Sequence, residues 1–375
     1  DKRFDIVREC VDSEFIYALI PRDTFAVRFI KRRMMRDYGE QFNEYLLRFQ
    51  DEHKYWWPIV YSNNLLVNIL DHVFPSFKSL WQVRALEKIL EQKKPNLIHV
   101  HWTYPAGFIV SQLSQKYEIP YVLTAHGSDI HSVVKRNRPS ALKALEKAAK
   151  CIFVSRALQE QAIYMGYSGE NAVVIPNGYD PTCFYPGKKE NAKTELGFEN
   201  RYLVGFVGNL VEVKNAQILP ELFLRIHEAN NQVDFVIIGD GPLKPELSRE
   251  FAEFHLDVKF TGNISPQDVG HYMRAMDVLA VPSQKEGWGC VITEAHACGT
   301  YVVGSNRGGI PEAIGSLGKT FSLEDNFTRK CASHIAHILE VGYNSLELVN
   351  RASSFKWSNI VQQEIDLYRS IVGTS

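Results

Sequence analysis

Several features that would place this chain of 375 residues in a specialised class are missing from its sequence. It has no apolar run near the roughly 18 residues of a transmembrane helix, and no secretory signal peptide is recognised. The formal net charge of -1 gives no reason to expect nucleic-acid binding, although a balanced total leaves room for a local basic patch. We therefore expect neither a membrane-spanning, a secreted nor a nucleic-acid-binding protein.

The cysteines also form no recognisable pattern. The six are Cys10, Cys151, Cys183, Cys290, Cys298 and Cys331. They include no Cys-x-x-Cys pair and no Cys/His spacing of the zinc type. Several lie within apolar runs, where a reduced, buried thiol is expected. This usage favours a reducing, cytoplasmic setting.

The composition that is present, 45% hydrophobic and 23% charged, is typical of a globular protein. The chain is too long for one ordinary core, so two domains are expected. Strands alternate with helices from residue 80 onward, which predicts parallel sheets with helices on both faces. Strands are predicted at 97–101, 121–125, 151–154, 172–176, 202–207, 234–238, 258–260, 277–282 and 301–303. Helices are predicted at 80–92, 106–117, 140–150, 157–165, 216–230, 244–254, from 266 onward, and at 358–371.

A turn-rich stretch from Pro176 to Gly187 predicts the domain boundary. We expect one Rossmann-like, doubly wound α/β domain over residues 1–182 and a second over 183–356. Two such domains facing each other place the carboxyl ends of both sheets at one cleft, where these folds bind ligands.

The first hundred residues are less informative. Strands are predicted at 15–20 and 55–61 and a helix at 24–49, in which basic residues between Arg28 and Arg36 alternate with apolar ones. Two interpretations stay open. The helix lies on an anionic membrane surface, or it packs one side on the domain and exposes its charges to water.

The segment from Ser283 to Glu294 is the central candidate site. It follows a buried-type strand, contains Gly287 and Gly289, and leads into a short helix that ends before Gly299. A helix N-terminus at a strand end suits a phosphate. Ionised carboxylates accept hydrogen bonds from hydroxyls, so Glu286 and Glu294 suit a sugar or ribose. The alternative is that Glu286 and Glu294 are a helix-capping pair and part of a solvated face.

Other candidates follow neighbouring strands. Lys214 lies just before a predicted helix, where it would complete a phosphate site, although a surface lysine there is common. The strand predicted at 234–238 is followed by Gly239, Asp240 and Gly241, and the strand predicted at 258–260 is followed by residues 261–264. These glycines make neither a full Gly-x-Gly-x-x-Gly nor a Walker loop, so a dinucleotide or P-loop site is not expected.

Three candidate histidines lie in the predicted first domain. His126 follows a strand beside Gly127 and would face the second domain, so a functional and a structural role stay open. His99 and His101 alternate along one strand like a metal pair, but no third ligand is evident. No metal site is expected.

Together these motifs resemble the retaining glycosyltransferases of family 4, also called glycosyl transferases group 1, which have the GT-B fold. The matching segments are 124–129, 174–178, 207–214, 238–242, 286–299, 308–312 and 355–359. The match extends from about residue 96 to the end, and the last segment resembles the start of a helix that crosses back to the first domain. The resemblance implies that residues 357–375 complete that domain.

The resemblance also implies roles for individual residues. Glu294 would hold the ribose hydroxyls, Glu286 those of the donor sugar, and His126 would reach that sugar from the other domain. Lys214 would neutralise the leaving diphosphate, which makes His126, Glu286 and Lys214 the catalytic candidates. The remaining donor-binding candidates are Gly208, Asn209, Gly239, Asp240, Gly241, Ile264, Gly287, Trp288, Gly289, Cys290 and Val291.

The implied activity is transfer of a hexose from a nucleoside-diphosphate sugar, such as a UDP- or GDP-hexose, to a saccharide or lipid-linked saccharide in glycan biosynthesis. Configuration would be retained, and neither a metal nor another cofactor would be needed. The expected setting is cytoplasmic, at the inner face of the membrane if the basic helix binds lipid. Two alternatives stay open: a nucleotide-sugar epimerase of the same fold, and a non-catalytic sugar-binding protein with two lobes.

The sequence departs from the family pattern at two places. Asn209 stands where the family often has an arginine beside the lysine, so Lys214 and the helix N-terminus would meet the diphosphate charge alone. The opening strand, Gly-Gly loop and helix of the family are not recognisable, and the chain starts at Asp1 without a Met. We therefore expect this unit to be missing or divergent.

Overall fold

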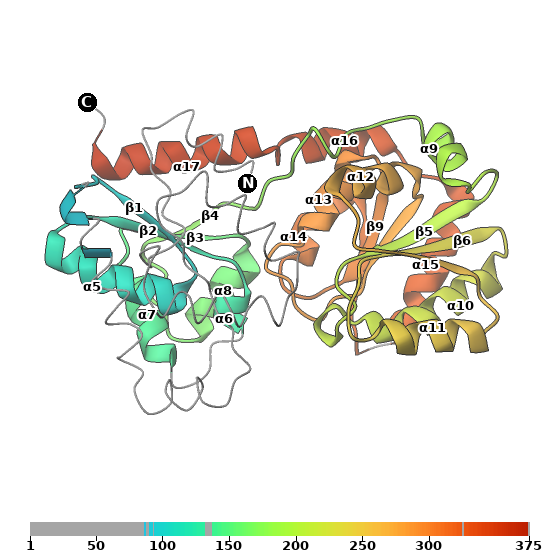
Figure 1. Cartoon of the computed structure of the whole chain (residues 1–375), viewed down its shortest axis with the longest axis horizontal. Helices are drawn as coiled ribbons and strands as arrows, with labels where there is room; N and C mark the ends of the chain where they lie inside the picture. The colour runs from blue at the N-terminus through green and yellow to red at the C-terminus, as the bar shows by residue number, and fades with distance from the viewer. Residues whose placement is uncertain (1–85, 88–89, 93, 132–136, 325, 374–375) are drawn as a thin grey trace, which may run out of the picture.

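Figure 1 shows the computed structural model of the chain, which describes residues 86–87, 90–92, 94–131, 137–324 and 326–373. The predicted elements at 15–20, 24–49 and 55–61, and with them the basic stretch, lie outside these residues. The predicted helix at 80–92 is described only at 86–87 and 90–92, where it is helical.

The first domain is built on a parallel sheet of order β1-β2-β3-β4. Its strands are β1 (Ile98–His101), β2 (Tyr121–Ala125), β3 (Lys150–Phe153) and β4 (Ala172–Val174). Its helices are α5 (Phe108–Tyr117), α6 (Ser128–His131), α7 (Arg138–Lys147) and α8 (Arg156–Tyr164). The prediction of a helix up to residue 150 was wrong at its end, because Lys150 already pairs with Val122 in the sheet.

The second domain is built on a parallel sheet of order β10-β9-β8-β5-β6-β7. Its strands are β5 (Tyr202–Val207), β6 (Val233–Ile238), β7 (Val258–Gly262), β8 (Val278–Val281), β9 (Tyr301–Ser305) and β10 (Lys319–Phe321). Its helices are α9 (Lys189–Leu196), α10 (Leu219–Ala229), α11 (Lys244–Glu253), α12 (Pro266–Ala275), α13 (Cys290–Ala297), α14 (Ile310–Ile314), α15 (Phe327–Val341) and α16 (Ser345–Ser353).

Helices cover both faces of this second sheet (Figure 1), as the predicted doubly wound arrangement requires. On one face, Phe223 of α10 stacks on Phe235 of β6 with ring centroids 4.5 Å apart. The alternation of apolar strands and amphipathic helices in the sequence is therefore explained by burial on two sides. The helix predicted from residue 216 begins only at Leu219, because two short 3-10 turns precede it.

Two chain segments connect the domains side by side. The N–H of Tyr179 donates to the carbonyl of Phe355 at 2.9 Å, and the N–H of Trp357 donates to the carbonyl of Tyr179 at 3.1 Å. Gly178 is required at this crossing, because a Cβ there would lie 2.7 Å from the Trp357 ring.

The closing helix, α17 (Trp357–Val372), confirms the predicted return to the first domain. It runs along the top of that domain in Figure 1. Ile360 of α17 lies in one buried cluster with Val122, Ile152 and Ile175. No helix among the described residues is long and apolar enough to cross a membrane.

Candidate active site

The candidate site lies where the strand order of the second sheet reverses. β5 lies between β6 and β8, and open α/β sheets bind ligands at such a switch point, outside the carboxyl ends of the strands. Lys214 follows β5, and Glu286 follows β8. Lys214 Nζ lies 2.5 Å from Glu286 Oε1, which also accepts a hydrogen bond from the Ser283 hydroxyl at 2.9 Å. The fold thus brings two predicted catalytic residues together.

The loop after Glu286 leads directly into a helix. Gly289 has φ +86°, a conformation that favours glycine, and α13 begins at the next residue. The first turn of α13 contains no acidic residue. The N–H groups and partial positive charge of this helix start therefore lie beside the Lys214–Glu286 pair, in an arrangement suited to an anion.

The titration of two α13 side chains is controlled by burial. Burial raises the pKa of Glu294 from its usual 4.5 to about 7. It also raises the pKa of Cys290 to about 12, and the nearby Glu294 and Glu286 act in the same direction. Cys290 is therefore a neutral thiol at physiological pH, which argues against a nucleophilic role.

On the side of the first domain, His126 belongs to a group of aromatic rings at the ends of β1 and β2. Its Nε2 shares a hydrogen bond with His101 Nδ1 at 2.8 Å, and the two rings stack with centroids 5.1 Å apart. The Trp102 ring lies 5.3 Å from the His126 ring and is 43% exposed. The imidazole predicted to reach a sugar is therefore held by a second imidazole.

Asp129 organises the backbone of the same loop. Its carboxylate accepts hydrogen bonds from the N–H groups of Thr103 and His126 at 2.9 Å, and of Gly127 at 3.0 Å. Burial raises the pKa of Asp129, while these N–H groups act in the opposite direction. Its side chain fixes the segment that faces the second domain.

The backbones of the two domains touch at Gly287, in a contact that we call the domain junction. A Cβ on Gly287 would lie 2.2 Å from the carbonyl oxygen of His126. A Cβ on Gly127, which has φ +118°, would lie 3.0 Å from the Gly287 Cα. The separation at Gly287 is too short for any side chain, and at Gly127 the close contact adds to a positive φ that itself favours glycine.

The remaining predicted loops lie at the neighbouring strand ends. A Cβ on Gly239 would lie 2.1 Å from the carbonyl oxygen of Gly208, so the loops after β5 and β6 are in backbone contact. Asp240 pairs at the surface with Lys244 at 3.1 Å. Asn209 is exposed, and Ile264 is half-buried after β7.

Two predicted donor-binding positions also have structural roles. The Trp288 side chain is only 5% exposed, and its ring packs 5.3 Å from the Phe355 ring. It therefore belongs to the core, and a contribution to the site would come from its backbone. Gly241 is needed for packing, because a Cβ there would lie 2.4 Å from the Leu210 carbonyl oxygen.

Sequence reasoning missed the roles of His101, of Asp129 and of Glu312, whose carboxylate accepts hydrogen bonds from the N–H groups of Arg156 and Ala157. Asp129 and Glu312 lie in the matching segments 124–129 and 308–312, but the sequence assigned neither of them a function. The spacing of Asp129, three residues after His126, is a signal for a side chain that binds loop N–H groups. His99 and His101 resembled a metal pair, but the structure gives His99 other partners: Thr124 Oγ1 at 2.7 Å and Tyr368 Oη at 2.6 Å.

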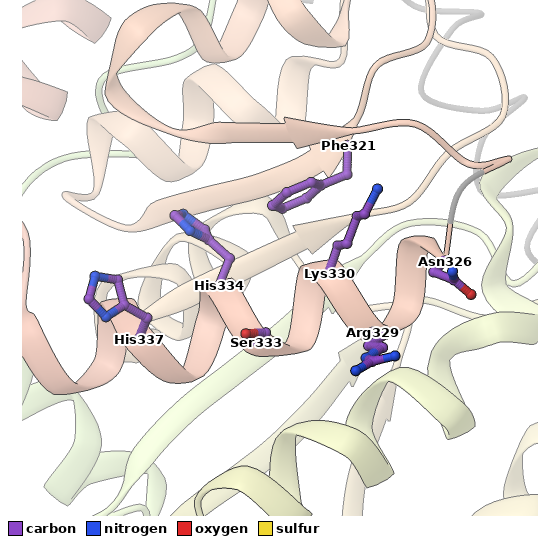
Figure 2. Close-up of a pocket in the computed structure, with 7 residues that line it drawn as sticks. All are labelled: Phe321, Asn326, Arg329, Lys330, Ser333, His334 and His337. Atoms are coloured by element: carbon purple, nitrogen blue, oxygen red, sulfur yellow. The ribbon is translucent and has the colours of Figure 1, made fainter.

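In the part of the chain that the structure describes, neither a metal cluster nor the hollow beside α15 coincides with this site. Within the described ranges, no three His, Cys, Asp or Glu side chains are grouped to hold a metal ion. A hollow of about 470 Å³ lies beside α15 and Phe321 of β10, and Figure 2 shows the residues that line it. Its lining is Phe321, Asn326, Arg329, Lys330, Ser333, His334 and His337. None of these was predicted as a site residue.

Comparisons with known sequences identify related proteins. A family model described as "Glycosyl transferases group 1" matches residues 188–354, and one described as "Glycosyltransferase Family 4" matches residues 53–182. The chain is 32% identical over 240 residues to the putative teichuronic acid biosynthesis glycosyltransferase TuaC of Bacillus subtilis, a match that covers 62% of this chain and 59% of that protein. The match therefore spans less than two thirds of that relative.

A second relative and a solved structure complete the comparison. The chain is 27% identical over 329 residues to the alpha-maltose-1-phosphate synthase of Mycolicibacterium smegmatis, which covers 76% of this chain and 82% of that protein. The crystal structure of HepE from Anabaena in complex with UDP superposes with a TM-score of 0.69 at 24% identity, over 77% of this chain and 82% of that one. This likeness shows the fold.

Proposed function

Because the chain belongs to the group 1 glycosyltransferases with the GT-B fold, we propose that it transfers a hexose from a nucleoside-diphosphate sugar to a saccharide or lipid-linked saccharide acceptor. Configuration at the anomeric carbon is retained in this proposal. The observation that carries it is the Lys214–Glu286 pair at the switch point, beside the start of α13 and opposite the His126 loop.

Charge complementarity supports the assignment of the diphosphate. A leaving diphosphate gains negative charge in the transition state, and preorganised positive groups stabilise it there more than in the ground state. Lys214 and the first N–H groups of α13 supply such positive charge. Asn209 is neutral, although the family pattern often has an arginine at this position. Lys214 and the N-terminus of α13 therefore supply the positive charge that faces the diphosphate.

The two glutamates are proposed to hold hydroxyls. Glu294, one turn into α13, accepts hydrogen bonds from the ribose hydroxyls. Glu286 accepts hydrogen bonds from hydroxyls of the donor sugar once the phosphate has replaced it as the partner of Lys214. The bond between the anomeric carbon and the phosphate oxygen breaks, and a bond to the acceptor oxygen forms on the same face. Because the acceptor oxygen attacks from the face on which the phosphate departs, no protein nucleophile is needed, and because the departing phosphate takes the acceptor's proton, no protein base is needed. Positioning then supplies much of the rate.

We extend the proposal to independence from metal ions, because Lys214 and the positively charged end of α13 already supply positive charge at the site. Retained activity in excess EDTA would support this part. Loss of activity that Mg²⁺ or Mn²⁺ restores would overturn it.

The experiment that tests the proposed transfer is a donor and acceptor screen. HepE was crystallised with UDP and with UDP-glucose, so the panel begins with UDP-hexoses and continues with GDP- and ADP-hexoses. We expect one donor to release its nucleoside diphosphate only when a saccharide acceptor is present, and NMR to show a product anomer of unchanged configuration. Nucleotide release without acceptor and with an epimer as the sole sugar product would overturn transfer.

A further inference from the structure

The motif from Gly308 to Glu312 has no part in the proposed chemistry, yet it joins the two domains. Glu312 lies in α14, at the edge of the second domain that faces α8 in Figure 1. Its Oε2 accepts a hydrogen bond from the N–H of Arg156 at 2.9 Å, and its Oε1 accepts one from the N–H of Ala157 at 2.8 Å. Both donors belong to the first turn of α8, in the first domain.

Helix α8 therefore receives its N-terminal cap from two domains. Ser155 is its N-cap residue, and the Ser155 hydroxyl accepts from the N–H of Leu158 at 3.1 Å. The N–H groups of Arg156 and Ala157, which have no partner within the helix, are bound by Glu312. A carboxylate at a helix N-terminus also interacts favourably with the helix dipole, and charge-assisted hydrogen bonds of this kind are stronger than neutral ones.

Glu312 is also connected to the loop between Glu286 and Gly289, which leads into α13. The N–H of Gly309 donates to the carbonyl of Glu286 at 3.0 Å, and a Cβ on Gly309 would lie 2.2 Å from the carbonyl oxygen of Gly287. On the other side, the Arg351 guanidinium donates to the carbonyls of Glu312 and Ala313 at 2.8 and 2.6 Å. The carboxylate is thus mounted on a helix that is fixed against the loop between Glu286 and Gly289.

We propose that Glu312 is a positioning residue that holds the two domains together across the donor site by capping α8. This inference rests on the proposed glycosyl transfer for its kinetic consequence. Its structural part, closure of the domains through this carboxylate, stands without turnover. When the cap forms, the His126 loop is brought against Gly287; when it is lost, the domains separate and the two halves of the site move apart.

Two variants remove the contact from opposite sides. Glu312→Gln keeps the size of the side chain but replaces one acceptor with an amide that cannot accept. Arg156→Pro removes one donor N–H at the first helical position, where proline is well tolerated, and Ser155 has the extended backbone that a following proline requires. Arg156→Ala, which keeps the N–H, and Glu340→Gln, on the exposed side of α15, are the matched controls.

The first measurement is the distance between spin labels, attached through noncanonical amino acids at the exposed positions Lys143 and Glu253 of the full chain. We expect Glu312→Gln and Arg156→Pro each to shift the distribution of label distances to longer values. The shift in the double variant should be smaller than the sum of the two single shifts, because both variants remove the same contact. The two controls should leave it unchanged. Unchanged distances in both test variants, with melting curves that show them folded, would overturn the proposal.

The second measurement separates closure from donor binding. UDP affinity, measured by calorimetry, should change by less than about twofold in Glu312→Gln, while kcat falls about tenfold or more, as expected for one lost charge-assisted hydrogen bond. A loss of UDP affinity as large as the loss of kcat would overturn the positioning role. If no donor is turned over by the unchanged chain, the proposed transfer fails, but the label distances still decide whether Glu312 closes the domains.

Discussion

At the scale of single residues, the charge of Lys214 is shared between a carboxylate and the ligand proposed here. Its Nζ lies 2.5 Å from Glu286 Oε1, so a diphosphate must compete with Glu286 for the ammonium group. In the proposed reaction the leaving group gains negative charge, and Lys214, not Glu286, can stabilise that charge. Preorganised contacts to developing charge contribute most to catalysis.

The first prediction therefore concerns Lys214→Ala. We expect turnover at saturating donor to fall by an amount equivalent to about 3 kcal/mol, which is typical when one preorganised contact to the leaving group is lost. Steady-state rates with excess donor measure the effect, and Lys319→Ala, an exposed lysine on β10, is the control. Equal rates in the two variants would remove Lys214 from the site.

The second prediction follows from the pKa of Glu294, which burial raises to about 7. In the proposed site, ribose hydroxyls donate to the ionised carboxylate of Glu294, so nucleotide binding would favour loss of its proton. UDP affinity should therefore weaken as pH falls below about 7, by up to about tenfold for each pH unit.

Calorimetric titrations of UDP from about pH 5 to pH 8 measure this dependence. The phosphate groups of UDP also titrate in this range, with a pKa near 6 for a terminal phosphate, so Glu294→Gln supplies the reference. The difference between the two pH profiles should vanish at low pH and grow through pH 7. Parallel profiles would contradict a role for Glu294 at the ribose.

At the scale of elements, α17 is linked to the site through side chains of β1. Tyr368 Oη shares a hydrogen bond with His99 Nδ1 at 2.6 Å, and the His99 ring lies 4.5 Å from the His101 ring, which in turn binds His126. The last helix thus supports the rings at the edge of the first sheet.

The third prediction is that Tyr368→Phe destabilises the chain by about 1 kcal/mol, the usual net contribution of one hydrogen bond. Chemical denaturation followed by tryptophan fluorescence measures the change. Tyr164→Phe removes a hydroxyl from a side chain that is 87% exposed and should have no measurable effect. If both substitutions have the same effect, the contact between α17 and β1 contributes nothing to stability.

The elements show why the sequence predicted some features and not others. Regular βα alternation and the Gly287 and Gly289 turn are local patterns, so the strand, loop and helix around Glu286 were predictable. The hydrogen bond between His101 and His126 joins two strands through their register, which no local pattern contains. The contact of Glu312 with Ala157 spans 155 positions and two domains, and it depends on how those domains meet.

At the scale of the whole molecule, the domains meet through backbone at the domain junction and through the Glu312 cap. Gly287 lies between them: its own loop carries Glu286, and the carbonyl of His126 lies against its Cα. A substitution here changes the spacing of the domains without removing any group that the proposed chemistry uses.

The last prediction is therefore that Gly287→Ala lowers transfer while each domain stays folded. The added Cβ would lie 2.2 Å from the His126 carbonyl oxygen, so the domains must shift apart, and a misplacement near 1 Å costs about a hundredfold in rate. Gly187→Ala is the control, because its Cβ would meet only the flexible Arg274 side chain at 2.8 Å. Initial rates and melting curves of both variants decide the matter: full activity in Gly287→Ala would show that the domains need not be in contact at this point during transfer.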